Sequence, residues 1–321
     1  MPQSTNTNQH ISPKKTPLIN ISRVAMPQSR VGTGKGSLET AACEIDRLPE
    51  ELLAAVISLT SPPDACRAAA VSRTFRPAAD SDAVWSCFLP RDLPQFAEGE
   101  LPGTPPSKKA LFRRLSDQPA LLPCKLVSMQ LDRATGAKCY TLSARSLHIA
   151  WGDTPQYWEW IDLGVVDEVK RFSEAAKLRG VWWLDIRGKI NRMMLSENLT
   201  YAAYMVFKLA DDGFNLLHSP FQDATVSVAG SDSTQQVCLQ SYMEVGDDGV
   251  PQKHILSPHI RVPLTDDIVL PRKRADGWME VELGEFYNEE GYDDEVSVSL
   301  METHTWKYGL VVWGIEIRVK K

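Results

Sequence analysis

The sequence predicts a small all-α module of three helices, followed by a larger all-β domain built as an antiparallel β-sandwich. Residues 45–90 are rich in alanine and repeat their apolar positions at helical spacing. Residues 91–123 contain six prolines, which is typical of a linker. From residue 124 onward, apolar and polar residues alternate as they do in strands. We therefore expect four segments: a tail at 1–44, the helical module at 45–90, a linker at 91–123 and the strand-rich domain at 124–321.

The tail differs from the rest of the chain in its charge. Residues 1–38 hold five bases and no acid, whereas the whole chain has a net charge of −6. The remainder therefore carries 30 bases against 41 acids, a charge of about −11. A body this acidic repels a phosphate backbone, so we expect no nucleic-acid ligand. The composition of residues 1–44 predicts disorder, with a start at Met26 or an organelle transit peptide as alternatives.

Several residues of the helical module mark where its helices begin. Pro49 fits the first turn of a helix, and two glutamates follow it where acids favour the helix dipole. Ser61 and Ser81 are capping residues ahead of a second and a third helix. A further short helix is expected in the linker, at 108–115. The expected apolar stripe of the first helix consists of Leu52, Leu53, Val56 and Ile57.

The C-terminal segment shows the period-two alternation of strands. The clearest cases are Met279–Leu283, Val296–Leu300 and the last run, in which Val311, Trp313, Ile315, Ile317 and Val319 should share one face. Further strands are expected at 139–151, 179–190, 201–210 and 235–243. A single helix, Lys170–Lys177, is expected among them.

Tryptophan is unusually frequent in the strand-rich segment, where eight of the nine lie after residue 150. Trp151 ends a predicted strand at a turn, and Trp158 and Trp160 lie in a predicted loop. Aromatic side chains at turns and loops are well placed to meet a ligand. The tryptophans in apolar runs, which we expect mainly in the core, are Trp182, Trp183 and Trp313.

The helical module resembles an F-box. The matching residues are Leu48-Pro49-Glu50-Glu51-Leu52-Leu53, Asp64, Val71-Ser72-Arg73 and Val84-Trp85. The resemblance implies docking onto a Skp-class adaptor, which bridges to a cullin and a ubiquitin-conjugating enzyme. The adaptor-binding residues that it implies are Leu48, Pro49, Leu52, Val71 and Trp85. For Leu52, Val56 and Trp85, packing inside the module itself is an equally good interpretation.

The strand-rich segment resembles the phloem protein 2 (Nictaba-like) lectins. The motifs are Ser143-Ala144-Arg145, Trp151 to Trp160, Trp183 to Lys189, Tyr204 to Lys208, Asp276-Gly277-Trp278, Glu282 to Phe286, Trp306 to Leu310 and Gly314 to Arg318. The resemblance implies a jelly-roll-like β-sandwich that binds N-acetylglucosamine oligomers, N-glycan cores or lactosamine-type glycans. The carbohydrate-binding residues that it implies are Trp151, Trp158, Glu295 and Glu302.

Glu295 and Glu302 place a physical condition on that site. They are seven residues apart, so a regular strand would put them on opposite faces. They can reach one ligand only across a bulge, or if one of them lies in a loop. A glycosidase pair of carboxylates is an alternative, but the resemblance implies binding without turnover.

The sequence thus predicts a non-catalytic adaptor subunit of an SCF-type ubiquitin ligase, with no cofactor and no metal. Its six cysteines show no C-x-x-C pair, and we expect them to be reduced and mostly buried, as in the cytoplasm and nucleus. No apolar run approaches the roughly 20 residues of a membrane span. Two alternatives remain: a ligase adaptor whose sandwich binds protein rather than sugar, and a free nucleocytoplasmic lectin.

Overall fold

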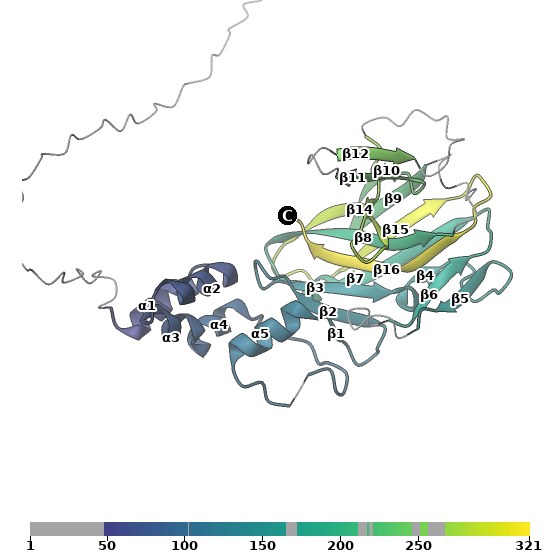
Figure 1. The fold of residues 1–321 in the computed structure, drawn as a ribbon. Coiled ribbons are helices and arrows are strands. Elements are labelled where there is room, and N and C mark those ends of the chain that lie inside the picture. Colours follow the sequence, from purple (N-terminus) through teal and green to yellow (C-terminus); the bar gives the residue numbers. More distant parts are fainter. Residues whose placement is uncertain are drawn as a thin grey trace, which may run out of the picture. The chain divides into compact units, whose positions relative to one another are not determined.

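The computed structural model describes residues 48–101, 103–164, 172–210, 217, 221–245, 251–255 and 267–321 (Figure 1). The tail predicted at 1–44 lies outside these residues. The helices are α1 (Glu50–Ser58), α2 (Pro62–Val71), α3 (Phe75–Asp80), α4 (Asp82–Phe88) and α5 (Lys108–Asp117).

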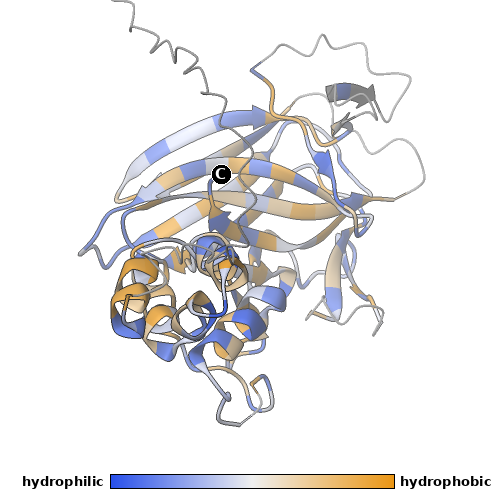
Figure 2. Ribbon diagram, turned by 60° about the vertical axis from the view of Figure 1, so that its left-hand side comes forward, coloured by the Kyte–Doolittle hydropathy of each residue, from blue (hydrophilic) through white to orange (hydrophobic). Residues whose placement is uncertain are grey.

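The helical module is confirmed, with the short α3 added to the three expected helices. The Oγ of Ser61 accepts a hydrogen bond from the N–H of Asp64 and caps α2. Ser81 caps α4 in the same way, through the N–H of Val84. In α1, the predicted stripe divides: Leu53 and Ile57 are buried, whereas the residue before each of them is exposed. Figure 2 shows the apolar residues along these helices in orange.

Helix α5 joins the helical module to the sandwich. The ring of Phe112 lies 5.1 Å from that of Trp85, and Lys109 pairs with Asp80 at 2.5 Å. At the other end of α5, the side-chain amide of Gln130, on β2, donates to the carbonyl of Ser116 at 2.8 Å. The predicted linker helix is therefore a packed bridge between the two parts.

Two sheets form the sandwich (Figure 1). The larger sheet has the order β1 (Ala120–Leu121), β2 (Val127–Leu131), β3 (Lys138–Ser143), β16 (Leu310–Val319), β8 (Leu199–Leu209), β14 (Met279–Asn288), β13 (Arg272–Lys273), β11 (Ser241–Val245) and β12 (Pro251–Ile255). Strand β6 (Glu174–Leu178) also pairs with β16, and β5 (Trp158–Asp162) pairs with β6. The smaller sheet has the order β10 (Ser231–Val237), β9 (Gln222–Val228), β15 (Glu295–Glu302), β7 (Leu184–Asn191) and β4 (His148–Ile149). Among the strands that the structure describes, all pairs are antiparallel except β11 with β13, and the predicted sandwich is confirmed.

The helix expected at Lys170–Lys177 is wrong where the structure describes it. Residues 165–171 lie outside the described part, and Glu174–Leu178 forms β6. The helix propensity of glutamate and alanine is overridden here by tertiary packing. Ala175 and Ala176 are fully buried, and β6 is hydrogen-bonded to strands on both sides.

The alternation predicted for β16 is interrupted by a bulge between Val312 and Gly314. After the bulge, Ile315 and Ile317 face the core between the sheets, as Val312 does before it. Trp313 instead joins a separate cluster on the other face, which also contains Val311, Phe172 and Trp278. The expectation that all the odd-numbered residues from 311 to 319 share one face is therefore wrong.

The cysteines also differ from expectation. Cys66, Cys87 and Cys124 are exposed, Cys139 is half-buried, and only Cys238 of those described is buried. None of these five cysteines forms a disulfide with another described residue.

Candidate functional site

The first candidate surface lies on α1 and the two residues before it. Leu48, Leu52 and Val56 are exposed, and Leu52 keeps 53% of its surface accessible. Leu52 and Val56 are four residues apart and lie along one side of the helix, while Leu48 lies just before its first turn. We call these three residues the aliphatic patch. Pro49, which directly precedes α1, is exposed as well, and so is Val71, the last residue of α2.

Trp85 is the one predicted adaptor-binding residue that the structure places in the interior. Its side chain is 1% exposed, and its indole N–H donates to the carbonyl of Ala79 at 2.8 Å. The ring packs between Phe88 and Phe112, and so against α5. Trp85 therefore offers no surface to a partner in this structure and holds the module to α5.

The second candidate surface begins with Trp151. This residue has a φ of 55° and is half exposed, because the turn at 149–154 directs it outward. Its ring centroid lies 5.7 Å from that of Tyr157. A non-glycine residue in the left-handed region is uncommon, and such residues concentrate at functional sites.

Trp158 and Trp160 belong to strand β5 and not to a loop. Trp158 is 2% exposed, and its indole N–H donates to the carbonyl of Ala150 at 3.1 Å. Trp160 is half-buried, donates to the carbonyl of Gly152 at 3.0 Å and is covered by the guanidinium of Arg145. The two rings thus fix the turn that presents Trp151, and Trp158 has no surface for a sugar.

Trp182 and Trp183, expected in the core, are exposed. They precede β7, and Val181 forms an isolated bridge with Lys307 in the loop after β15. The ring of Trp182, 61% exposed, lies 6.3 Å from that of Trp306. A Cβ on Gly180 would lie 2.2 Å from Trp306, so the Trp306 ring packs directly on this glycine.

The two pairs of rings belong to neighbouring loops. The carbonyl of Tyr157 accepts from the backbone N–H groups of Arg179 at 2.8 Å and Gly180 at 3.4 Å. Three loops therefore meet at one end of the sandwich and display aromatic side chains. We call Trp151, Tyr157, Trp182 and Trp306 the aromatic cluster.

Glu302 lies inside this arrangement and not on its surface. Its carboxylate pairs with the buried ammonium of Lys307 and accepts from the N–H of His304 and the hydroxyl of Thr305. Lys307 also donates to the carbonyl of Trp182 at 2.9 Å. Burial alone would raise the pKa of Glu302, but Lys307 and His304 more than offset it, and the pKa is lowered. This ion pair connects the loops that carry Trp182 and Trp306.

Glu295 lies at the far end of β15. It is exposed and pairs with Lys189 at 3.0 Å. Strand β15 pairs with β7 without irregularity from Glu295 to Glu302, so the two carboxylates lie on opposite faces, about 23 Å apart along the strand. That separation does not suit a glycosidase pair. Of the four predicted sugar residues, Trp151 is exposed beside the loop that Glu302 holds, Trp158 is buried beneath the turn that carries Trp151, and Glu295 lies at the other end of the strand.

Within the described ranges, no group of three or more histidine, cysteine, aspartate or glutamate side chains is arranged to hold a metal ion. The helices of these ranges are also too short or too polar to cross a membrane.

Comparison with known proteins identifies both parts of the chain. The F-box-like family model matches residues 45–91, and the phloem protein 2 model matches residues 137–319. "F-box protein PP2-B10" from Arabidopsis thaliana is 36% identical over 296 residues, which cover 89% of this chain and 98% of the relative. "Putative F-box protein PP2-B2" from the same plant is 38% identical over 304 residues, covering 91% and 88%.

Among solved structures, the xylan-binding domain CBM22-1 of Paenibacillus barcinonensis Xyn10C aligns over 56% of this chain and 88% of that domain. The identity is 11% and the TM-score 0.25, so this likeness carries no argument about ligands. The two family models and the relatives at 36–38% identity are decisive. The chain belongs to the F-box proteins that carry a phloem protein 2 domain.

Proposed function

We propose that this chain is the substrate-recognition subunit of an SCF-type ubiquitin ligase. The aliphatic patch docks a Skp-class adaptor, and through it a cullin, while the sandwich binds glycans or glycoproteins that contain N-acetylglucosamine. The chain itself performs no covalent chemistry. It holds a glycoprotein close to the conjugating enzyme and so raises the effective concentration of its lysines. This work would take place in the cytoplasm and nucleus.

The aliphatic patch carries the adaptor half of the proposal. Leu48, Leu52 and Val56 are apolar and accessible although buried positions lie beside them on the same helix. Burying a leucine or valine contributes roughly 1.5–3 kcal/mol, so covering the patch with a partner is strongly favourable. A single exposed leucine would need no explanation, whereas an aligned set of apolar residues marks a protein contact.

Co-purification with the adaptor tests this half. The double variant Leu52→Ser with Val56→Ser should lose the adaptor, since it makes the patch polar without touching the core. The matched control is Leu126→Ser, which replaces an exposed leucine of the sandwich. Retention of the adaptor by the patch variant would contradict the proposed docking.

The aromatic cluster carries the glycan half. Aromatic rings cover the C–H faces of pyranoses, and hydroxyls pair with polar groups around them. Four exposed rings on three adjoining loops offer such faces at one end of the sandwich. The pairing of Trp182 with Trp306, held from below by Lys307, gives part of this surface a fixed shape before any ligand arrives.

The test is retention of the full chain, co-expressed with the adaptor, on immobilised N-acetylglucosamine oligomers and elution by free oligomer. Trp151→Ala and Trp182→Ala should each weaken retention strongly. Tyr287→Ala removes an exposed ring near the C-terminal end of β14, away from the aromatic cluster, and should not change retention. A complex with adaptor that ignores the oligomers would show that the sandwich recognises a protein surface.

A further inference from the structure

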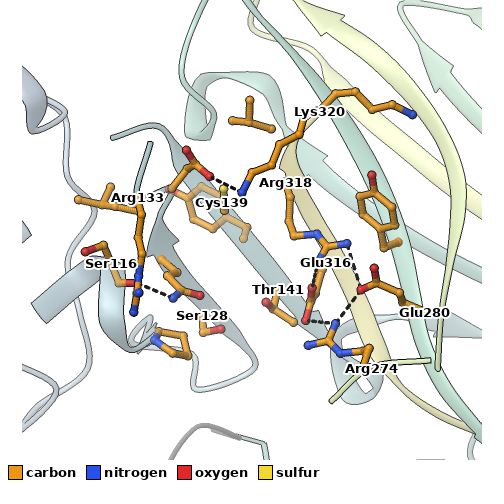
Figure 3. Close-up of a pocket in the computed structure, with 18 of the residues that line it drawn as sticks. Ser116, Ser128, Arg133, Cys139, Thr141, Arg274, Glu280, Glu316, Arg318 and Lys320 are labelled. Atoms are coloured by element: carbon orange, nitrogen blue, oxygen red, sulfur yellow. Dashed lines mark hydrogen bonds and ion pairs between the residues drawn. The ribbon is translucent and has the colours of Figure 1, made fainter. Parts of the chain in front are cut away.

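The outer face of the larger sheet carries a cavity of about 550 Å³ that neither candidate surface uses. Its floor is formed by side chains of β3, β8, β14 and β16 that point away from the core (Figure 3). Ser116, at the end of α5, and Ser128, on β2, lie at its edge. The cavity is therefore a concave region of a sheet face, bordered on one side by the helix that joins the two parts of the chain.

Four charged side chains at the centre form a closed ring. Arg274 donates to Glu280 and to Glu316, both at 3.0 Å. Arg318 pairs with Glu280 at 3.1 Å and with Glu316 at 3.2 Å. Figure 3 shows the two guanidinium groups and the two carboxylates meeting in alternation. We call these four residues the charged ring.

Aromatic and hydroxyl groups flank the charged ring. The guanidinium of Arg318 lies 4.0 Å from the centroid of the Tyr204 ring, and the Tyr204 hydroxyl pairs with Glu282 at 3.1 Å. Trp313 lines the cavity as well. Its indole N–H is buried and has no hydrogen-bond partner among the described residues.

The charged ring is fixed in place and still accessible. Burial works against the charge of Arg274, but Glu316, Asp276 and Glu280 raise its pKa, so the guanidinium stays ionised. The four side chains keep between 11% and 34% of their surface exposed. A guanidinium has five N–H donors and a carboxylate about four acceptor sites, so the ring leaves part of both sets unused.

These features discriminate between classes of ligand. The charges of the ring cancel, and the whole cavity lining has six bases and five acids, so its net charge of about +1 attracts an ion only weakly. A peptide strand cannot extend the sheet here, because β8 is hydrogen-bonded to β14 on one side and to β16 on the other. A hydroxyl group both donates and accepts, and it can bond to a guanidinium and a carboxylate that are already side by side.

We propose that this cavity is a second carbohydrate site, which takes a neutral oligosaccharide on the charged ring and Tyr204. The ligand class follows the carbohydrate recognition put forward under Proposed function, but the site is separate from the aromatic cluster. A chain with both sites would bind two segments of one glycan or two glycans. Two linked contacts give avidity that neither site has alone.

Calorimetric titration of the full chain with chitopentaose, xylopentaose and mannopentaose tests the site. The ring variant Glu316→Gln with Arg318→Gln keeps the net charge while removing two charges. The cluster variant is Trp151→Ala with Trp182→Ala. Thermal unfolding of each variant shows that it is folded. Tyr204→Phe removes one hydroxyl only and serves if the ring variant does not fold.

We expect binding of at least one pentaose to survive in the cluster variant. That binding should weaken about tenfold or more in the ring variant, because hydrogen bonds to charged groups are lost. It should weaken by a smaller factor in Tyr204→Phe. If both sites bind, each variant should weaken the binding without abolishing it. Binding that is lost in the ring variant and wholly unchanged in the cluster variant would uphold this site and refute the role proposed for the aromatic cluster.

Three results would overturn the inference. In the first, the cluster variant loses all binding and the ring variant none, which leaves Proposed function intact. In the second, a peptide or a sulfated oligosaccharide binds through the charged ring and no neutral pentaose does. In the third, none of the three pentaoses binds to the unaltered chain.

Discussion

The helical module and the sandwich place their apolar side chains in opposite ways. The module exposes aliphatic residues along α1 and buries its single tryptophan, Trp85. The sandwich packs its aliphatic residues between the sheets and exposes Trp151, Trp182 and Trp306 at one end. An exposed aliphatic patch marks a contact with another protein, and the flat faces of exposed rings can cover the C–H faces of sugars. The difference indicates two kinds of partner for one chain.

The largest effect is expected from Trp85→Ala, which tests whether the buried tryptophan of the module is structural. The substitution removes the ring that packs on Phe88 and Phe112 and leaves a cavity between α4 and α5. The free energy of unfolding should fall by about 3–5 kcal/mol, as measured by urea denaturation. Trp182→Ala is the matched control, and a similar loss there would break the comparison.

Glu302→Gln tests the ion pair beneath the exposed tryptophans. At neutral pH we expect a loss of about 1.5–3 kcal/mol, because the hydrogen bonds of Lys307 to a charged partner are weakened. The folded-state pKa of Glu302 is below its usual value of 4.5. A carboxyl group whose pKa is lower in the folded state than in the unfolded state stabilises the fold. That contribution is fully present at a pH above the unfolded-state pKa and is lost as the pH falls through the folded-state pKa.

The difference in melting temperature between the unaltered chain and Glu302→Gln should therefore be full at pH 7 and shrink below about pH 4.5. Glu295→Gln is the control, since that carboxylate is exposed and lies at the other end of β15. A difference that grows as the pH falls would show that Glu302 does not hold these loops as an ion.

Gly180→Ala sharpens the comparison at the aromatic end. The new methyl group would lie 2.2 Å from the Trp306 ring, which must move. Because Trp306 is partly exposed, it can swing outward, and we expect a cost near the low end of overpacking, about 1 kcal/mol. Tryptophan fluorescence should change and retention on N-acetylglucosamine oligomers should fall. Gly103→Ala, where the added carbon meets nothing within 4 Å and the backbone φ is not positive, is the matched control.

The smallest effect on stability is expected from Leu52→Ser. Its side chain contacts solvent in the free chain, so the free energy of unfolding should change by no more than about 0.5 kcal/mol. Leu53→Ser, one position further along α1, replaces a buried side chain and should destabilise the module strongly. Equal effects of the two substitutions would mean that the aliphatic patch is covered within the chain.

Sequence reasoning predicted the fold class and both family resemblances, because helical spacing, prolines and alternation extend over many residues. It was wrong where a single residue decides the outcome. Trp182 and Trp183 lie in an apolar run, yet β7 begins only at Leu184, so they fall outside the sheet. Trp158 follows a turn, yet it is the first residue of β5 and faces inward. The alternation of apolar and polar residues predicts that side chains point to opposite faces in turn, but it does not predict at which residue a strand begins.

The binding surfaces depend on contacts between segments far apart in the sequence. The pairing of Glu302 with Lys307 is local, but the bond from Lys307 to the carbonyl of Trp182 spans 125 positions. The charged ring joins residues 274 and 280 to 316 and 318 over β8, which lies between β14 and β16 in the sheet. One signal was available: Gly180 between a strand and two tryptophans suggests close approach of another group.

The bulge in β16 has an evolutionary consequence. On either side of Trp313, Val312 is paired with Phe207 and Gly314 with Val206, which are consecutive partners on β8. A chain that lacked residue 313 could keep each of these pairings and every later one, because the ladder already passes over that position. A deletion elsewhere in β16 would turn all following side chains to the wrong face. Lineages can therefore gain or lose one residue at this point while the architecture of the sandwich is inherited intact.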